Sequence, residues 1–157
     1  MSEPNVMANS RRKCREIMTK NVQTANRTAS LMEVARILKE VDVGILPIVE
    51  EETNKLIGLV TDRDIVVRAV AEGKPAETPV GEIMTTETFT AGPDDFAFEA
   101  IRTMGQRQVR RVPIVDDEGV LQGIVSMADI ALEMEDQREI AETLEDISSG
   151  AAFWNKS

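Results

Sequence analysis

Residues 30–41 carry apolar side chains at the spacing of one helix face. Ser30 and Glu33 open this stretch three positions apart, which is the spacing of a capping box. The apolar positions are Leu31, Val34, Ala35, Leu38 and Val41. This pattern predicts a helix that begins after Ser30 and reaches Val41.

Two short apolar runs follow the predicted helix, at 44–49 and 56–60. Both are rich in residues that favour strands, and an acidic turn at 50–54 separates them, so we expect two buried strands. A second helix is expected to begin near Asp62 and to run to about Glu72, where glycine and proline residues end it.

The same order of elements recurs in the second half of the chain. The residues Glu16-Ile17-Met18-Thr19 return as Glu82-Ile83-Met84-Thr85, an offset of 66 that becomes 65 after the acidic turn. Other identical pairs at these offsets are Thr24 and Thr90, Arg36 and Arg102, Pro47 and Pro113, Gly58 and Gly123, and Asp64 and Asp129. Identities in this order and at this spacing indicate a tandem duplication.

The second copy is expected to repeat the elements of the first. These elements are a helix over about 95–107, strands at 112–115 and 121–125, and a helix from about Met127. Phe96 stands where the first copy has the cap residue Ser30. We therefore expect Asp94 or Asp95 to cap this helix.

The duplication divides the chain into five parts. They are a flexible N-terminal segment (1–13), a first domain (14–73), a linker (74–81), a second domain (82–136), and an acidic C-terminal helix and tail (137–157). A unit of about 60 residues buries little surface by itself. We therefore expect the copies to pack with pseudo-twofold symmetry around a shared core, which leaves a cleft between them.

The composition excludes several kinds of chemistry. Cys14 is the only cysteine among 157 residues, and the chain has no histidine. An intramolecular disulfide, a thiolate–imidazole pair and a zinc site of cysteine and histidine ligands are therefore excluded. We expect no catalytic residue and no metal site.

Hydropathy and charge narrow the choice of partners. No apolar run approaches the roughly 18 to 20 residues that cross a bilayer, and the N-terminus lacks the apolar core of a signal peptide. We expect a cytoplasmic protein with no membrane partner. The net charge of −10 repels phosphate backbones and argues against nucleic-acid binding.

The charge is distributed unevenly between the two ends. The basic residues of the N-terminal end are Arg11, Arg12, Lys13, Arg15 and Lys20, whereas residues 129–157 are strongly acidic. The two ends could attract each other within or between subunits, or the acidic tail could simply be solvated. Phe153 and Trp154 could dock on the module or on a neighbouring subunit, or could bind a partner.

Several motifs together resemble a CBS-domain pair (cystathionine β-synthase domains, or Bateman module), of the stand-alone prokaryotic type. The motifs are the I-M-T starts, the strands G-I-L-P-I-V and R-R-V-P-I-V, and the corners L-I-G-L-V-T-D-R-D-I and L-Q-G-I-V-S-M-A-D-I. The resemblance covers about residues 14–136. It implies an α/β (α+β) fold, a tandem pair of β-α-β-β-α units with pseudo-twofold symmetry.

The resemblance also implies a ligand. Family members bind AMP, ADP, ATP or S-adenosylmethionine in the cleft between the copies, and two modules often stack into a disc-shaped homodimer. Other members bind no nucleotide. No further cofactor is implied.

The family's ligand-binding aspartate falls on Asp64 and Asp129, which would accept hydrogen bonds from the ribose hydroxyls. A carboxylate has two acceptor oxygens and can hold two adjacent hydroxyls. The hydroxyls of Thr61 and Ser126 would face the ribose or phosphate. The alternative is structural, because Ser or Thr followed three residues later by Asp also forms a capping box.

The resemblance places adenine recognition on the strand before each corner. The residues are Val43, Gly44, Ile45 and Pro47 in the first copy, and Val109, Arg110, Val112 and Pro113 in the second. Packing in the core is the alternative for the apolar members. Gly44 is the more informative position, because a missing side chain lets a ring approach the backbone.

Arginine side chains are the candidates for phosphate contacts, because their forked donors match phosphate oxygens. The candidates are Arg63, Arg107, Arg110 and Arg111, with Arg68 a weaker one. Surface solvation is the alternative for each. Ala128 replaces Arg63 in the second copy, so the two corners should differ, and our hypothesis places the phosphate at Arg63.

We therefore expect a non-enzymatic regulatory sensor that binds an adenosine-containing ligand and signals to an unidentified protein partner. The alternative is a ligand-free dimerisation or protein-interaction module. The absence of a nucleophile–base pair weighs against an enzyme.

Overall fold

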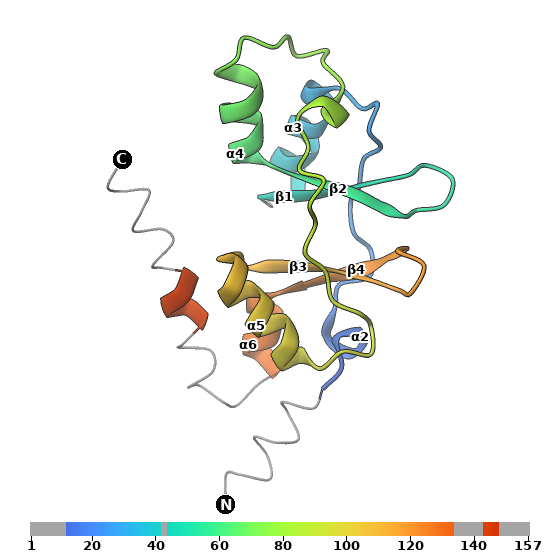
Figure 1. Ribbon diagram of the computed structural model, residues 1–157, viewed down its shortest axis with the longest axis vertical. Helices are drawn as coiled ribbons and strands as arrows, with labels where there is room; N and C mark the ends of the chain where they lie inside the picture. Colours follow the sequence, from blue (N-terminus) through green and yellow to red (C-terminus); the bar gives the residue numbers. More distant parts are fainter. Residues whose placement is uncertain (1–11, 42–43, 134–142, 148–157) are drawn as a thin grey trace, which may run out of the picture. The chain divides into compact units, whose positions relative to one another are not determined.

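The computed structural model describes residues 12–41, 44–133 and 143–147 (Figure 1). The chain forms two compact units, which we name after the repeat that supplies most of each. The first-repeat unit comprises Asn21–Thr88 with Glu118–Leu121, and the second-repeat unit comprises Met1–Lys20, Phe89–Asp117 and Gln122–Ser157. Each unit is described by itself. The predicted domain boundaries stay a prediction.

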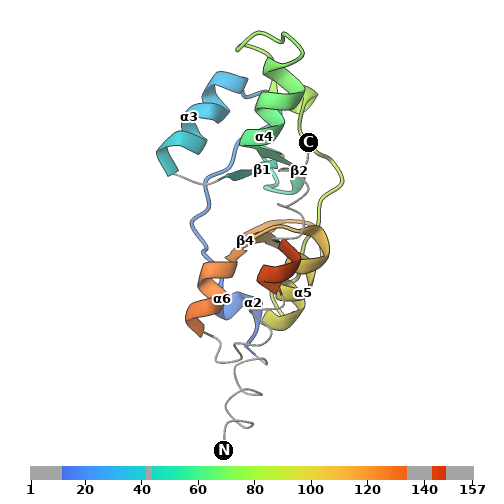
Figure 2. The ribbon, with the colours of Figure 1, turned by 90° about the vertical axis from the view of Figure 1, so that its left-hand side faces the viewer.

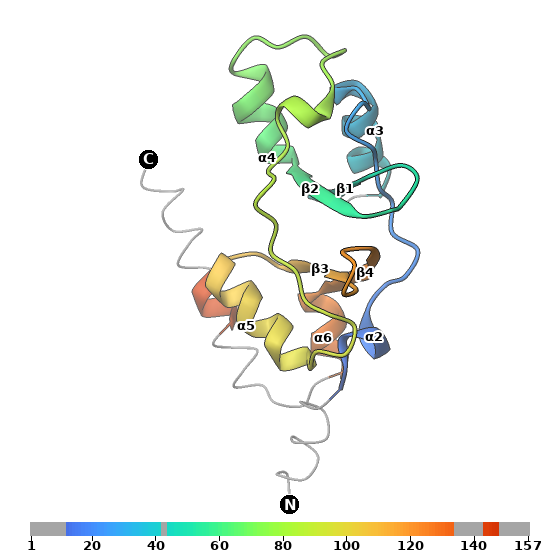
Figure 3. The ribbon, with the colours of Figure 1, turned by 45° about the vertical axis from the view of Figure 1, so that its right-hand side comes forward.

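The first-repeat unit is a two-stranded sheet with its helices on one face (Figure 3). Its elements are α3 (Leu31–Val41), β1 (Ile45–Val49), β2 (Leu56–Thr61), α4 (Asp62–Asp64), the π-helix η1 (Ile65–Val70) and the 3-10 helix η2 (Val80–Glu82). The capping predicted for α3 is present, since the Ser30 hydroxyl accepts a hydrogen bond from the Glu33 N–H at 3.1 Å.

Single-residue bridges extend this small sheet on both sides. Strands β1 and β2 are antiparallel, with Ile45 opposite Thr61. Ala25 forms a parallel bridge to Ile48 of β1, and Thr85 forms an antiparallel bridge to Leu59 of β2. The sheet therefore needs residues from both ends of the first-repeat unit.

The second-repeat unit has the same plan, with helices α5 and α6 beside the short α2 (Figure 2). Its elements are α2 (Cys14–Ile17), α5 (Ala97–Arg107), β3 (Arg111–Val115), β4 (Leu121–Ser126) and α6 (Met127–Glu133). Ala91 bridges Ile114 in parallel, and Thr19 bridges Ile124 antiparallel. The expected class, a mixed fold with a duplicated helix–strand plan, is confirmed.

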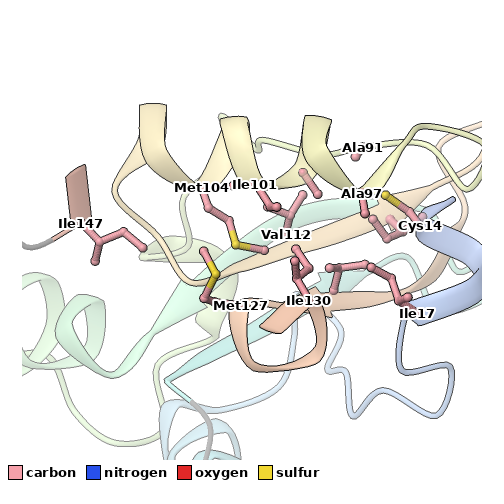
Figure 4. Close-up of a cluster of buried hydrophobic side chains, with 13 residues drawn as sticks. Cys14, Ile17, Ala91, Ala97, Ile101, Met104, Val112, Met127, Ile130 and Ile147 are labelled. Atoms are coloured by element: carbon pink, nitrogen blue, oxygen red, sulfur yellow. The ribbon is translucent and has the colours of Figure 1, made fainter. Parts of the chain in front are cut away.

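The core of the second-repeat unit includes residues from far apart in the sequence (Figure 4). Cys14 and Ile17 of α2 pack with Ile101 and Met104 of α5 and with Ile130 of α6. Burial of apolar side chains contributes roughly 25 cal/mol per Å². The helix α2 is therefore an integral part of this unit, although it belongs to the first repeat in the sequence.

The repeated Glu-Ile-Met-Thr motif explains how each unit is completed. The segment around Met18 and Thr19 lies on Gly123 of the second repeat, and the segment around Met84 and Thr85 lies on Gly58 of the first. A Cβ atom at Gly123 would come within 2.6 Å of the Thr19 carbonyl oxygen. The glycines are needed because another backbone or methionine side chain occupies the space. Each unit thus receives the segment with which the other repeat begins, and we call these two segments the exchanged segments.

The predicted side-chain cap of α5 is wrong. Phe96 is the N-cap residue and makes no side-chain capping bond. Asp95 instead accepts a hydrogen bond from the Gly92 N–H at 2.7 Å, and Asp94 lies 2.6 Å from the Arg15 guanidinium. The first N–H of the helix donates to the carbonyl of Arg12 at 2.7 Å. The Arg12 carbonyl, just before α2, thus satisfies the Ala97 N–H, which would otherwise need a cap.

The helix after the first corner begins at Asp62 as predicted, but most of it has π geometry. Ala71 N–H donates to the Val66 carbonyl five residues earlier, at 2.9 Å. Gly73, with φ 72°, follows this helix. A π-helix is wider than an α-helix and is rare. The apolar pattern alone does not distinguish the two.

Two basic residues of the N-terminal end lie near an acidic residue outside the acidic tail, and the expected attraction between the two ends stays a prediction. Lys13 and Arg15 both lie near Asp94, at 3.6 and 2.6 Å. Of the acidic tail, residues 143–147 are described as helical, with Thr143 and Ile147 buried. Phe153 and Trp154 lie outside the described residues. Among the described helices, none combines the length and the apolar character that crossing a bilayer requires.

Candidate functional site

The first corner lies in the first-repeat unit, where β2 ends and α4 begins. The Thr61 N–H donates to Oδ2 of Asp64 at 2.9 Å, and the Asp64 N–H donates to Oγ1 of Thr61 at 3.0 Å. These two bonds make a complete capping box. Both side chains are half-buried.

The second corner has the same arrangement in the second-repeat unit. The Ser126 N–H donates to Oδ2 of Asp129 at 3.2 Å, and the Asp129 N–H donates to Oγ of Ser126 at 3.1 Å. The structural role considered as an alternative is therefore present in both copies. The box uses one oxygen of each carboxylate, whereas an ionised carboxylate accepts at both. Capping and ligand binding are thus compatible.

The start of the preceding strand is held at each corner by one backbone hydrogen bond. The Gly44 carbonyl accepts from the Asp62 N–H at 3.3 Å, and the Arg110 carbonyl accepts from the Met127 N–H at 2.8 Å. A Cβ atom at Gly44 would have Asp62 Oδ1 as its nearest neighbour, at 4.0 Å. The described surroundings leave room for a Cβ atom at Gly44, and its contact with an adenine ring stays a prediction.

The residues expected to contact adenine fall into two groups. Gly44, Ile45, Val109 and Arg110 lie at the corners and are half-buried or exposed, as is Arg111, a candidate for a phosphate contact. The other members, Pro47, Val112 and Pro113, are buried in the cores of their units. Core packing, the alternative reading of these residues, is what the structure shows for the second group. Val43 lies outside the described residues.

The candidate phosphate ligands also have different surroundings. Arg63 follows Asp62 in the first turn of α4 and is exposed. Arg107 is the last residue of α5, and Arg110 lies three residues further on, at the second corner. Arg68 donates from Nη1 to Oγ1 of Thr85 at 3.3 Å, a contact with the exchanged segment that the sequence did not reveal.

Both corners lie within residues that match a known family. The sequence model of the CBS domain matches residues 14–70 and 80–136. These two matches include both corners and most of the chain.

The chain belongs to the CBS-domain family.

Relatives of known sequence include other CBS proteins. The CBS domain-containing protein YhcV of Bacillus subtilis is 36% identical over 134 residues, which are 85% of this chain and 94% of YhcV. Hypoxic response protein 1 of Mycobacterium tuberculosis is 34% identical over 118 residues, 74% of this chain and 81% of that protein. An inosine-5′-monophosphate dehydrogenase of Bifidobacterium longum matches over only 19% of its length.

Solved CBS structures share the fold. The crystal structure of hypoxic response protein I with two coordinated zinc ions has a TM-score of 0.71 and 33% identity, covering 78% of this chain and 99% of that one. The CBS domain pair of protein MJ0100, in complex with 5′-methylthioadenosine and S-adenosyl-L-methionine, has a TM-score of 0.67 and 34% identity, covering 77% and 94%.

Away from the corners, the described residues of this CBS protein form a hollow but no cluster of metal ligands. Among the described residues, no group of three or more cysteine, histidine or acidic side chains could hold a metal ion. A hollow of about 240 Å³ lies beside α5, lined by Phe98, Ile101, Arg102, Gly105, Gln106, Thr143 and Asp146. No residue predicted to bind a ligand lines it.

Cys14 is the one titratable group with a clearly shifted pKa among the described residues. Burial, followed by the nearby negative charges of Asp95 and Glu99, raises the pKa of the Cys14 thiol to about 12. The thiol therefore stays neutral and is a core residue of the second-repeat unit.

Proposed function

We propose that this CBS protein is a non-enzymatic regulatory sensor that binds an adenosine-containing ligand at its corners and signals to a protein partner. The observation that carries the proposal is the duplicated corner. In each copy a half-buried aspartate, a hydroxyl residue and the start of a strand are held together by backbone hydrogen bonds. The solved CBS pair with 5′-methylthioadenosine and S-adenosyl-L-methionine supports this ligand class.

Each proposed contact uses a group that the corner presents. The carboxylate oxygens of Asp64 and of Asp129 would accept hydrogen bonds from ribose hydroxyls, in addition to the capping bond. The open backbone at Gly44 would lie against the adenine ring, with Ile45 beside it. In the second copy the adenine ring would lie against Val109 and Arg110. The predicted cleft between the copies stays a prediction.

Signalling requires that the ligand bind one arrangement of the protein better than another. The largest shift that a ligand can cause equals its differential affinity for the two arrangements. Such a mechanism needs no chemical step and no resident cofactor. The enzymes among the relatives match over small parts of their length, 22% and 19% for two of them, which is consistent with a regulatory module.

Calorimetric titration with AMP, ADP, ATP and S-adenosylmethionine tests the proposal. Asp64→Asn and Asp129→Asn are the informative variants, because the asparagine oxygen can still accept the capping bond while the charge is lost. We expect ligand affinity to fall by about tenfold, worth ~1.4 kcal/mol, with little change in stability. Absence of heat with every ligand, in folded and ligand-free protein, would refute the sensor.

A ligand-free dimerisation or interaction module is the second candidate. It is favoured by the complete capping boxes, which need no ligand, and by exposed apolar residues after both corners. Val66, Val70 and Leu132 are 59%, 67% and 86% exposed. On this hypothesis Asp64→Ala and Asp129→Ala lower stability by about 1 kcal/mol each and leave a homodimer intact in light scattering.

A further inference from the structure

The two corners have the same backbone arrangement but carry different side chains. Residues 44 and 110 each accept a hydrogen bond from the first N–H of the helix, so they occupy equivalent places. The helix begins with Asp62 in the first copy and with Met127 in the second. The corners therefore present different side chains to a ligand at equivalent backbone positions.

The first corner has an excess of negative charge. It carries the carboxylates of Asp62 and Asp64 and the guanidinium of Arg63. Position 44 is glycine and position 45 is isoleucine, so the strand contributes no charge. Asp62 is exposed, and its Oδ1 accepts from the Arg63 N–H at 2.8 Å. The residues of the first corner therefore carry two carboxylates and one guanidinium.

The second corner has an excess of positive charge. Arg110 is exposed and Arg111 is half-buried, at the positions equivalent to Gly44 and Ile45. Met127 is only 7% exposed and Ala128 is uncharged, so Asp129 is the one acid of the helix start. The residues of the second corner therefore carry two guanidiniums and one carboxylate. Forked arginine donors match phosphate oxygens.

We infer that the corners divide the ligands by charge. The second corner takes a phosphate-bearing adenine nucleotide through Arg110 and Arg111, and the first corner takes an adenosine ligand that lacks phosphate. This inference rests on the proposed function and deepens it. It moves the phosphate away from Arg63, where our sequence-based hypothesis had placed it, because Asp62 and Asp64 offset the charge of Arg63.

The test compares AMP with adenosine by calorimetry on the full chain. We expect Arg110→Gln and Arg111→Gln each to weaken AMP binding by about tenfold. The matched control is Arg63→Gln, which removes the same charge from the first corner and should change AMP affinity less than about twofold. Adenosine affinity should be unchanged by Arg110→Gln. Circular dichroism checks that each variant is folded.

Dependence on salt supplies a second measurement on the unmodified protein. AMP affinity should fall between low and physiological ionic strength, since an exposed ion pair is screened, and adenosine affinity should not. A parallel titration of Asp62→Asn should show stronger AMP binding at the first corner, through the loss of one repulsive charge.

The outcomes separate the two proposals. If neither AMP nor adenosine binds to folded protein, the proposed sensor fails, and the charge division fails with it. If AMP binding is weakened by Arg63→Gln but not by Arg110→Gln or Arg111→Gln, only the charge division is overturned. Binding of adenosine without any binding of AMP also overturns the charge division and leaves the sensor in place.

Discussion

The helices α3 and α5 occupy the same place in the two repeats but begin differently. At α3, the Ser30 hydroxyl caps the helix, and the Leu31 N–H also donates to the Thr78 carbonyl at 2.9 Å. At α5, Phe96 offers no side-chain cap, and the helix relies on the Arg12 carbonyl. In both copies a backbone carbonyl from a distant segment, Thr78 or Arg12, accepts from the first N–H of the helix. Only α3 also has a side-chain cap. Tertiary structure can therefore replace a local capping signal.

The same comparison extends to the glycines under the exchanged segments. A Cβ atom at Gly58 would first meet the Met84 sulfur, at 2.6 Å, and the Thr85 carbonyl oxygen at 3.1 Å. A Cβ atom at Gly123 would meet the Thr19 carbonyl oxygen itself at 2.6 Å. A flexible side chain can move aside more easily than backbone. A methyl group added at Gly123 should therefore lower stability more than one added at Gly58.

The largest effect is expected from the two glycine-to-alanine substitutions. Gly123→Ala should lower the free energy of unfolding by about 2–3 kcal/mol, and Gly58→Ala by about 1 kcal/mol, both through overpacking. Urea titrations followed by circular dichroism measure the difference. Equal losses would contradict the proposed role of the backbone at Gly123.

The next effect is a dependence of stability on pH. The titratable Cys14 occupies the place that the apolar Val80 has in the other copy, so this effect is expected in one unit. The thiol pKa is about 12 in the fold and near 9 without burial. The contribution of the buried, neutral thiol to the free energy of unfolding is fully present below pH 9. Above it the unfolded chain releases the proton while the folded chain keeps it, so the free energy of unfolding falls by up to about 1.4 kcal/mol per pH unit.

The control for this pH effect is Cys14→Ala, which should lack this part of the decline between pH 9 and 11. Urea titrations at several pH values measure it. Parallel curves for both proteins would contradict the buried thiol.

A smaller effect is expected from the cap of α3. Ser30→Ala removes the hydroxyl that accepts from the Glu33 N–H, and should cost about 1 kcal/mol. Thr61→Ala and Ser126→Ala remove equivalent acceptors at the corners and should cost similar amounts. Thermal unfolding of the three variants gives the comparison. A loss well below this value at Ser30 would show that the Thr78 carbonyl suffices there too.

The smallest effect is expected at Asp94, which pairs with Arg15 on the surface of the second-repeat unit. Both side chains are more than half exposed, and such pairs contribute about 0.2–1 kcal/mol. Asp94→Asn should therefore lower stability slightly, and only at low salt. A loss that persists at high salt would indicate a further structural role for Asp94.

Periodicity predicted the longer helices and the four strands of both repeats, but not the short helices α2 and η2. The boundaries of β2 and α4 agree with the turn and capping signals around Thr61 and Asp64, because these signals act between neighbouring residues. The carbonyl that serves α5 comes from Arg12, and no local pattern links residues so far apart. The π geometry of η1 likewise depends on hydrogen bonding that apolar spacing does not encode.

At the candidate site, too, the local motifs were predictable from the sequence and the contacts between distant residues were not. The capping boxes at Asp64 and Asp129 were among the predicted alternatives, and the ligand-binding role of both aspartates stays a prediction. The position of Asp62 against Gly44, and the contact of Arg68 with Thr85, required the fold. One signal for the exchanged segments was available, because Met18 and Met84 recur outside any predicted helix or strand.

The exchange of segments has a practical consequence for dissecting the protein. A truncated protein that starts at the second match of the CBS sequence model would leave out α2, and with it the Cys14 and Ile17 side chains. A piece cut at 21 and 88 keeps the bridge from Thr85 to Leu59. A circular permutant that begins at Phe89 and ends at Thr88 would make each unit continuous along the chain, apart from 118–121.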